Sequence, residues 1–116
     1  MRYKDKSIKF SSNLVPLIKN KSKTLTYRIG KKYDYLKKGD IVMFQESGKK
    51  GNGIFAEVEI TDKYHKAFGE LSHKAPGHEK FSSKEEMRNT YERYYKQEIK
   101  NDQEILVLGF TVIKLQ

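Results

Sequence analysis

A short cationic segment carries the side chains best suited to chemistry. Residues 23–28 read KTLTYR, with a lysine, a threonine and an arginine at Lys23, Thr26 and Arg28. Side chains two positions apart on a β-strand point to the same face, which sets the Thr26 hydroxyl beside the Arg28 guanidinium. Lys23 begins the strand and can swing over that face. Such a group can bind a phosphate or carbonyl oxygen, or activate the hydroxyl as a nucleophile.

The nucleophile interpretation requires a base. Threonine alone is a poor nucleophile, and a lysine acts as a base only where burial or a neighbouring cation lowers its pKa. Arg28 is such a cation. The same spacing is also expected of an ordinary strand, because threonine favours strands and basic side chains favour the wet face. Spacing alone leaves both interpretations open.

A basic loop, residues 30–38, follows this strand and alternates lysines with tyrosines. Lysines contact phosphates, and tyrosine rings stack on unpaired bases. The lysines expected to bind nucleic acid are Lys31, Lys32, Lys37 and Lys38. The rings that accompany them are those of Tyr33 and Tyr35. In the alternative interpretation one or both rings pack into the core while the lysines stay in water.

A carboxylate further along the chain is the third candidate. Glu79 follows His78 and a Pro76-Gly77 pair, in a segment expected to be a loop between helices. From such a loop a glutamate can reach over the mouth of a barrel and act as a general acid. The alternative is a glutamate that only contacts solvent.

The histidines give no sign of a metal site. His65, His73 and His78 are eight and five residues apart, a spacing that no helix or strand brings to one face, and the chain has no cysteine. There is also no phosphate-binding glycine loop, no dinucleotide motif and no Gly-x-Ser-x-Gly. The sequence therefore predicts neither a metal nor another cofactor.

Hydrophobic periodicity predicts the elements that position these residues. Strands are expected at residues 6–10, 24–29, 41–46, 54–61 and 104–115, with a hairpin loop at 47–53. Short helices are expected near residues 14–18 and 65–71. A longer helix begins at the N-cap Ser83, with Glu86 completing a capping box, and runs to about residue 97. Its expected packing stripe is Met87, Tyr91, Tyr94 and Tyr95.

This order of elements predicts one domain, residues 1–116, of the α+β class. We expect a small, mostly antiparallel β-barrel with two or three helices beside it. An open α+β sheet is the alternative, because sequence patterns rarely separate the two.

The charge of the chain is unevenly distributed. The net charge is +9, and residues 1–40 hold 12 basic but only 3 acidic residues, whereas the rest is balanced. Such a segment attracts polyanions in a salt-dependent way, unless it serves only as a solubilising surface. No signal peptide is visible, and the longest apolar run, residues 105–110, is far shorter than the ~20 residues of a membrane span. The absence of cysteine fits a reducing cytoplasm, which is the expected location. The sequence does not indicate an oligomeric state, and a monomer is the default expectation.

The segment at residues 23–28 resembles the signature of an ASCH domain. That family is marked by Gly-x-Lys-x-x-Thr-x-Arg after its first helix; Lys23, Thr26 and Arg28 match, and Lys21 stands at the glycine position. Further similarity lies in KGD at residues 38–40, AEVEIT at 56–61, the helix from Ser83 and the closing strand. The resemblance covers roughly residues 13–115.

The resemblance implies a β-barrel fold like that of the PUA domain, an RNA-binding module. Within the superfamily the chain is most similar to small amidohydrolases that deacetylate N(4)-acetylcytidine. In that branch the matching residues imply Lys23 as the base, Thr26 as the nucleophile and Glu79 as the proton donor. The residues expected to bind the substrate are Arg28, Lys21, Tyr33 and Tyr35.

Two further functions remain as alternatives. The first is an RNA-binding module with weak ribonuclease activity, and the second, less supported, is a protein–protein adaptor. The expected partner is accordingly a nucleoside or single-stranded RNA, without a membrane and without a cofactor.

Overall fold

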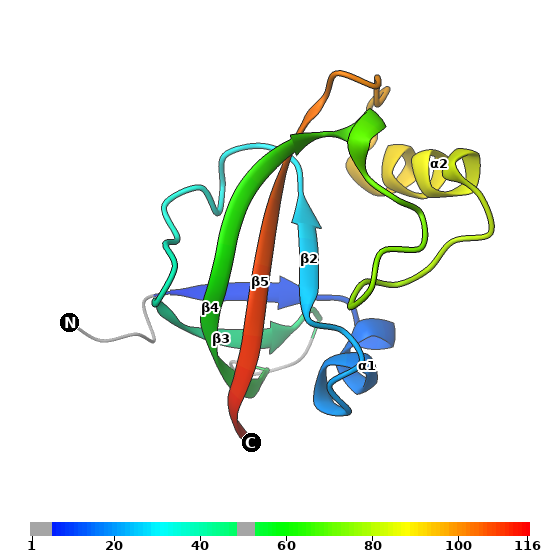
Figure 1. The fold of residues 1–116 in the computed structure, drawn as a ribbon. Helices are drawn as coiled ribbons and strands as arrows, with labels where there is room; N and C mark the ends of the chain where they lie inside the picture. The colour runs from blue at the N-terminus through cyan, green and yellow to red at the C-terminus, as the bar shows by residue number, and fades with distance from the viewer. Residues whose placement is uncertain (1–5, 49–52) are drawn as a thin grey trace.

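Five strands and two α-helices make up the computed structural model, which describes residues 6–48 and 53–116 (Figure 1). Most of the expected hairpin loop at 47–53, including Lys49 and Lys50, lies outside the described residues. The strands are β1 (Ser7–Phe10), β2 (Leu25–Arg28), β3 (Ile41–Glu46), β4 (Ile54–Ala67) and β5 (Glu104–Leu115). The helices are α1 (Val15–Lys19) and α2 (Lys84–Tyr95), with short 3-10 turns η2 (Ser12–Leu14) and η3 (Phe68–Glu70).

The strands form one curled sheet in the order β1-β3-β4-β5-β2. The β1–β3 pair is parallel and the other three pairs are antiparallel. Register shifts in β4 bend the long β4–β5 ribbon, one of them opposite Gly109, where an added Cβ would lie 3.0 Å from the Asp62 Cβ. The α+β class is confirmed, and the sheet is an incomplete barrel, since β1 and β2 are not paired.

The edge strands β1 and β2 nevertheless meet through a side chain. Arg28 Nη2, on β2, donates a hydrogen bond to the Lys9 carbonyl oxygen of β1 at 2.9 Å. One member of the predicted cationic group thus spans the gap between the two edges of the sheet.

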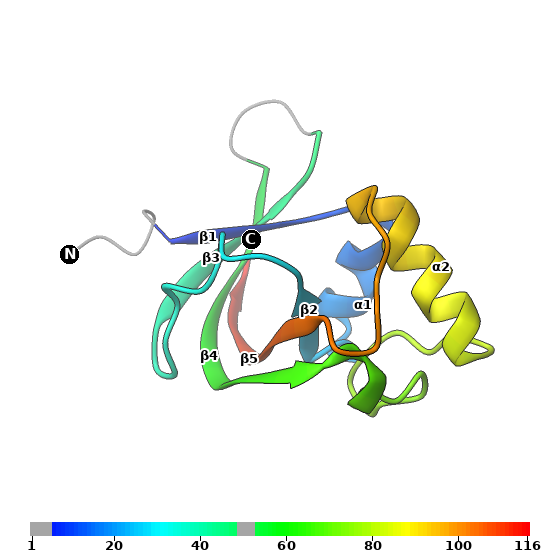
Figure 2. The ribbon, with the colours of Figure 1, turned by 90° about the horizontal axis from the view of Figure 1, so that it is seen from above.

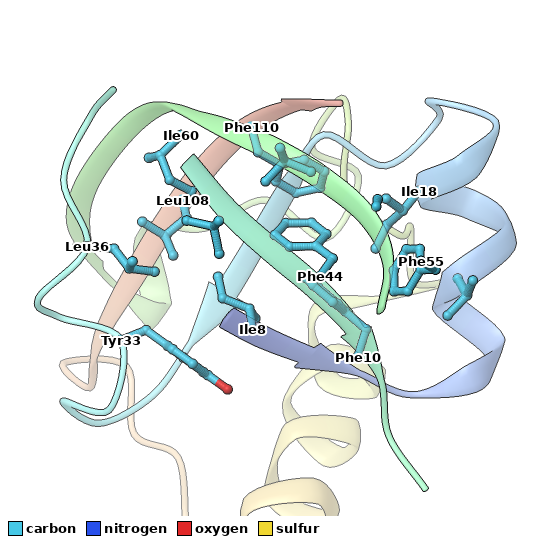
Figure 3. Close-up of a cluster of buried hydrophobic side chains, with 14 of the residues drawn as sticks. Ile8, Phe10, Ile18, Tyr33, Leu36, Phe44, Phe55, Ile60, Leu108 and Phe110 are labelled. Atoms are coloured by element: carbon cyan, nitrogen blue, oxygen red, sulfur yellow. The ribbon is translucent and has the colours of Figure 1, made fainter. Parts of the chain in front are cut away.

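Two clusters of buried side chains lie on opposite faces of β5 (Glu104–Leu115), with Leu106 and Leu108 in the first and Ile105 and Val107 in the second. The first fills the inside of the curl, where Phe10, Phe44 and Phe110 point toward one another (Figure 3). The second includes Tyr27 and Met87 and lies under α2. The alternation predicted for residues 24–29 is confirmed, because Leu25, Tyr27 and Ile29 all pack on the second cluster. Thr26 and Arg28 therefore face the other way.

Helix α2 begins where the sequence predicts. The Ser83 hydroxyl accepts a hydrogen bond from the Glu86 N–H at 3.0 Å, whereas the Glu86 carboxylate accepts from Ser82 N–H at 2.8 Å instead of closing a capping box with Ser83. Of its expected packing stripe, Met87 is buried but Tyr94 is 63% exposed. Figure 2 shows both α-helices on the same side of the sheet, next to β2. Neither helix of the described chain has the length and apolar character needed to cross a bilayer.

The helix predicted at residues 65–71 is wrong. Strand β4 continues to Ala67, which pairs with Glu104 of β5, and only the single turn η3 follows. The reason lies in β5, a long apolar strand that supplies backbone partners along the whole of β4. A helix over residues 65–71 would break the pairing of His65, Lys66 and Ala67 with β5, and Gly69 would weaken such a helix further.

Candidate active site

A cavity of about 340 Å³ opens beside β2 and contains the predicted catalytic residues. Lys23, Thr26 and Glu79 all line it, together with Arg28. Tyrosines from α2 form another part of the wall. The volume lies within the range of small-molecule binding sites.

Lys23 and Glu79 form an ion pair in this cavity. The Lys23 side chain is only 2% exposed, and its Nζ donates to Glu79 Oε2 and, at 2.6 Å, to the Leu25 carbonyl oxygen. Burial lowers the pKa of Lys23, against the attraction of Glu79. Burial acts to raise the pKa of Glu79, but the charge of Lys23 and the hydrogen bond from its ammonium outweigh it, so that this pKa is lowered. Glu79 is thus a carboxylate in the resting site.

The turn between α1 and β2 sets the position of Lys23. Lys23 N–H donates to the Leu17 carbonyl oxygen of α1 at 3.0 Å, which ties the start of the strand to the helix. Just before it, Lys21 turns the chain with a φ of 69°. The Lys21 side chain is exposed and does not line the cavity, so the structure does not bring it to the predicted substrate-binding group.

Thr26 lies next to an immobilised guanidinium. Its Oγ1 accepts a hydrogen bond from Arg28 Nε at 3.1 Å, and the side chain is almost fully buried. Besides its bond to Lys9, Arg28 places Cζ 4.7 Å from the centre of the Phe10 ring. These contacts hold the guanidinium beside the hydroxyl, and the hydroxyl proton remains available to another acceptor.

The loop at residues 72–82 brings Glu79 to Lys23. The Gly77 carbonyl oxygen accepts from Thr24 N–H at 2.7 Å and Leu25 N–H at 3.0 Å, so the loop is pinned to the start of β2 (Figure 1). Gly77 has a φ of +80°, and a Cβ there would lie 2.3 Å from Thr24 Oγ1. Only glycine allows this close approach without strain.

His78 is a site residue that the sequence did not single out for this role. Its ring stacks on Tyr27 with the centroids 4.0 Å apart. Its Nδ1 lies 3.0 Å from the Glu79 carbonyl oxygen, and its Nε2 lies 3.3 Å from the Tyr91 hydroxyl. Burial, reinforced by Lys23, lowers its pKa to about 4. The neutral ring therefore donates from Nδ1 and accepts from Tyr91 at Nε2, which orders the backbone at Glu79.

The other histidines do not join the site. His65 Nε2 lies 3.0 Å from an Asp34 carboxylate oxygen, away from the cavity lining. Within residues 6–48 and 53–116, no three His, Asp or Glu side chains gather in a way that could hold a metal ion.

The basic loop does not act as one unit. Tyr33 is buried in the first cluster, as Figure 3 shows, with Arg28 Cζ 5.2 Å from its ring centre. The alternative in which this ring packs into the core is therefore the correct one. Tyr35 is 49% exposed and lines neither of the two cavities described here. Among the four lysines, only Lys32 lines either of these two cavities, the smaller one. The remaining three are Lys31, Lys37 and Lys38, all exposed.

Three further contributors to the cavity wall were missed. Lys9 comes from β1, and its involvement follows from the meeting of the sheet edges, which no local pattern reveals. Tyr94 and Tyr95 were expected to pack α2 onto the domain, yet both line the cavity. The only sequence signal for them was the density of tyrosines in this helix.

Comparison with solved structures identifies the fold. An ASCH domain of Lactobacillus crispatus superposes with a TM-score of 0.70 at 15% identity, covering 96% of this chain and 80% of that one. A variant of the ASCH protein of Zymomonas mobilis gives a TM-score of 0.64 at 12% identity, covering 95% and 71%. An Enterococcus faecalis protein of the family DUF984 gives 0.68 at 17% identity, covering 89% and 68%. No family model matches the sequence, and no curated protein matches it significantly. The chain thus has the fold of solved ASCH domains.

Proposed function

We propose that this protein is an ASCH-type amidohydrolase that removes an acyl group from an acetylated cytidine or a related nucleoside. The observation that carries the proposal is that Lys23, Thr26 and Glu79 line one cavity, with Lys23 and Glu79 paired inside it. The resemblance of residues 23–28 to the acetylcytidine-deacetylating branch assigns the same three residues. Aromatic rings in the cavity wall, among them Tyr27 and Tyr91, suit a flat base.

The proton balance of the Lys23–Glu79 pair fits this chemistry. The ion pair and the neutral pair, an amine beside a carboxylic acid, contain the same number of protons. One internal transfer therefore converts the resting pair into a base and an acid without exchange with solvent. Burial lowers the pKa of Lys23 and so favours that transfer.

In the acyl-transfer step Lys23 takes the proton of Thr26, and Oγ1 attacks the acetyl carbonyl carbon. The carbon–nitrogen bond breaks, and Glu79 protonates the departing cytosine amine, which leaves an acetyl ester on Thr26. Arg28 Nη1, which has no hydrogen-bond partner within the described residues, can donate to the developing oxyanion. Water then attacks the ester and gives one proton to Glu79, while Lys23 returns a proton to Thr26. The product leaves as acetic acid, which loses its remaining proton to solvent as acetate.

The test is turnover of N(4)-acetylcytidine by the purified protein, with release of cytidine followed by chromatography. Thr26→Val and Lys23→Met should each lower kcat by roughly 100-fold or more, because each removes a group that acts in the transition state. Thr26→Ser keeps a hydroxyl and should retain activity. Mass spectrometry of the wild type quenched during turnover should find an acetyl group on Thr26.

A matched control separates chemistry from folding. Thr111 is an exposed threonine on β5, outside the cavity lining, so Thr111→Val makes the same change away from the site. We expect normal turnover in that variant. Absence of wild-type turnover, or full turnover in Thr26→Val, would rule out the proposed activity.

The charge distribution supports one alternative, an RNA-binding module. Residues 1–40 carry 12 basic and 3 acidic residues, and Lys31, Lys32, Lys37 and Lys38 are all exposed. This alternative expects binding to single-stranded RNA, measured by fluorescence anisotropy, that weakens steeply as salt increases. Binding that ignores salt would count against it. Tyr33 is of no use as a stacking platform because its ring is buried.

A further inference from the structure

A second cavity adjoins the candidate active site. It has a volume of about 240 Å³ and shares four lining residues with the larger cavity. The shared residues are Lys9, Arg28, Tyr94 and Tyr95. A ligand whose base occupies the larger cavity therefore has a neighbouring space for the rest of the molecule.

The second cavity is strongly cationic. Lys9, Lys32 and Arg28 line it, and none of its lining residues is acidic. Within the described residues, none of these three cations takes part in a salt bridge. A space lined by three cationic residues and no carboxylate attracts an anion.

Arg28 is held in place by several contacts. Its Nε bonds to Thr26, its Nη2 bonds to the Lys9 carbonyl oxygen, and its guanidinium lies against the rings of Phe10 and Tyr33. Lys32 extends over the Tyr33 ring at 5.5 Å from its centre. A planar, anchored guanidinium in a cavity that two lysines also line is suited to a tetrahedral phosphate oxyanion.

We propose that the second cavity is a phosphate subsite, so that the preferred substrate is a phosphorylated nucleoside, either a nucleotide or a residue within RNA. The inference rests on the proposed function, because the acylated base is assigned to the larger cavity. Tyr94 is 63% exposed at the boundary of the two cavities. In a polymer its ring offers a stacking surface for the next base.

Binding of cytidine 5′-monophosphate and of cytidine, measured by calorimetry, tests the subsite without any turnover. We expect the nucleotide to bind about tenfold more tightly, as one or two charge-assisted hydrogen bonds provide. Lys32→Gln should remove most of that preference. Lys31→Gln, the same change at an exposed neighbour that lines neither cavity, should leave it intact. Equal binding of both ligands, undetectable binding of the nucleotide, or equal losses in the two variants would overturn the subsite.

Further binding and turnover measurements distinguish a free nucleotide from RNA as the source of the phosphate. They also distinguish failure of the subsite from failure of the proposed hydrolase activity. A trinucleotide with a central cytidine should bind more tightly than the mononucleotide, and lose that gain in Tyr94→Ala, if the natural phosphate belongs to RNA. Equal affinity for the two phosphorylated probes assigns the subsite to a free nucleotide. Phosphate-dependent binding without hydrolysis of any acetylated substrate would retain the subsite and reject the proposed function. Equal turnover of N(4)-acetylcytidine and of its 5′-monophosphate would support the proposed function and reject the subsite.

Discussion

At the scale of single residues, Lys21 adopts a conformation that its side chain disfavours. Its φ is 69°, in the left-handed region where residues other than glycine are strained by their Cβ. The ASCH signature has glycine at this position, and the geometry explains why: the chain must reverse between α1 and β2 for Lys23 to enter the cavity. Lysine is tolerated here at a cost in stability.

Replacing Lys21 with glycine should therefore stabilise the protein. We expect Lys21→Gly to raise the free energy of unfolding by roughly 0.5–1 kcal/mol. The removed backbone strain stabilises the folded state, and the greater entropy of glycine in the unfolded chain offsets part of that gain. Turnover should be unchanged, since Lys21 does not line the cavity. Urea denaturation measures the change. Lys19→Gly in the last turn of α1 is the control and should lose about 1 kcal/mol. A less stable Lys21→Gly variant would contradict the strain argument.

At the scale of elements, the docking of the 72–82 loop on β2 creates the Lys23–Glu79 pair. Gly77 makes the two hydrogen bonds at the contact and leaves no room for a Cβ. Neither the strand nor the loop holds the pair by itself. Loss of the contact should therefore affect activity as well as stability.

Gly77→Ala tests this docking. The substitution combines strain at φ +80° with a Cβ 2.3 Å from Thr24 Oγ1, and we expect a loss of roughly 2–3 kcal/mol in the free energy of unfolding, with a marked fall in kcat/KM. Gly30→Ala is the matched control: its φ is +91° but no atom lies within 4 Å of the added Cβ. It should lose only about 1–2 kcal/mol and keep its kcat. Identical behaviour of the two variants would show that the contact with Thr24 has no special role.

Helices and strands are predicted correctly from the sequence where local patterns decide them, and incorrectly where distant strands decide them. The alternation at residues 24–29 is local, so it correctly set Thr26 and Arg28 on one face, opposite Tyr27. The end of β4 was wrong because it depends on β5, whose pairing reaches Ala67 from a distant part of the chain. Burial of Tyr33 likewise depends on the curl of the whole sheet. The sequence alone therefore could not decide whether this ring packs into the core or is free to stack on a base.

At the scale of the whole molecule, the candidate site depends on contacts between segments far apart in sequence. Lys23 and Glu79 are 56 positions apart, and Arg28 and Lys9 are 19 apart. Residue types and strand periodicity could nominate each residue, but only the folded chain brings them to one cavity. The resemblance to ASCH domains could nominate Lys23, Thr26 and Glu79 together in advance, because a family signature reflects such long-range contacts, and their roles stay a prediction.

The buried site should also make global stability depend on pH. His78 has a pKa lowered from 6.5 to about 4, by burial and by the charge of Lys23, with Glu79 acting in the opposite direction. Between pH 6.5 and 4 the unfolded chain binds a proton at this histidine and the folded protein does not. Unfolding then takes up protons, so the free energy of unfolding falls as the pH falls through this window, by roughly 3 kcal/mol in all.

Thermal unfolding between pH 7 and 4 measures this dependence. The lowered pKa of Glu79 adds a loss of the same sign, beginning near its ordinary value of 4.5, so the decline that starts closer to pH 6.5 belongs to His78. We expect His78→Gln to flatten the curve above pH 4.5, whatever its effect on absolute stability from the lost stacking on Tyr27. His73→Gln, at a histidine outside the cavity lining, should keep the wild-type slope. If His78→Gln declined as steeply as the wild type over this range, the histidine would have to be protonated in the folded protein, and its Nε2 could not accept a hydrogen bond from Tyr91 as described.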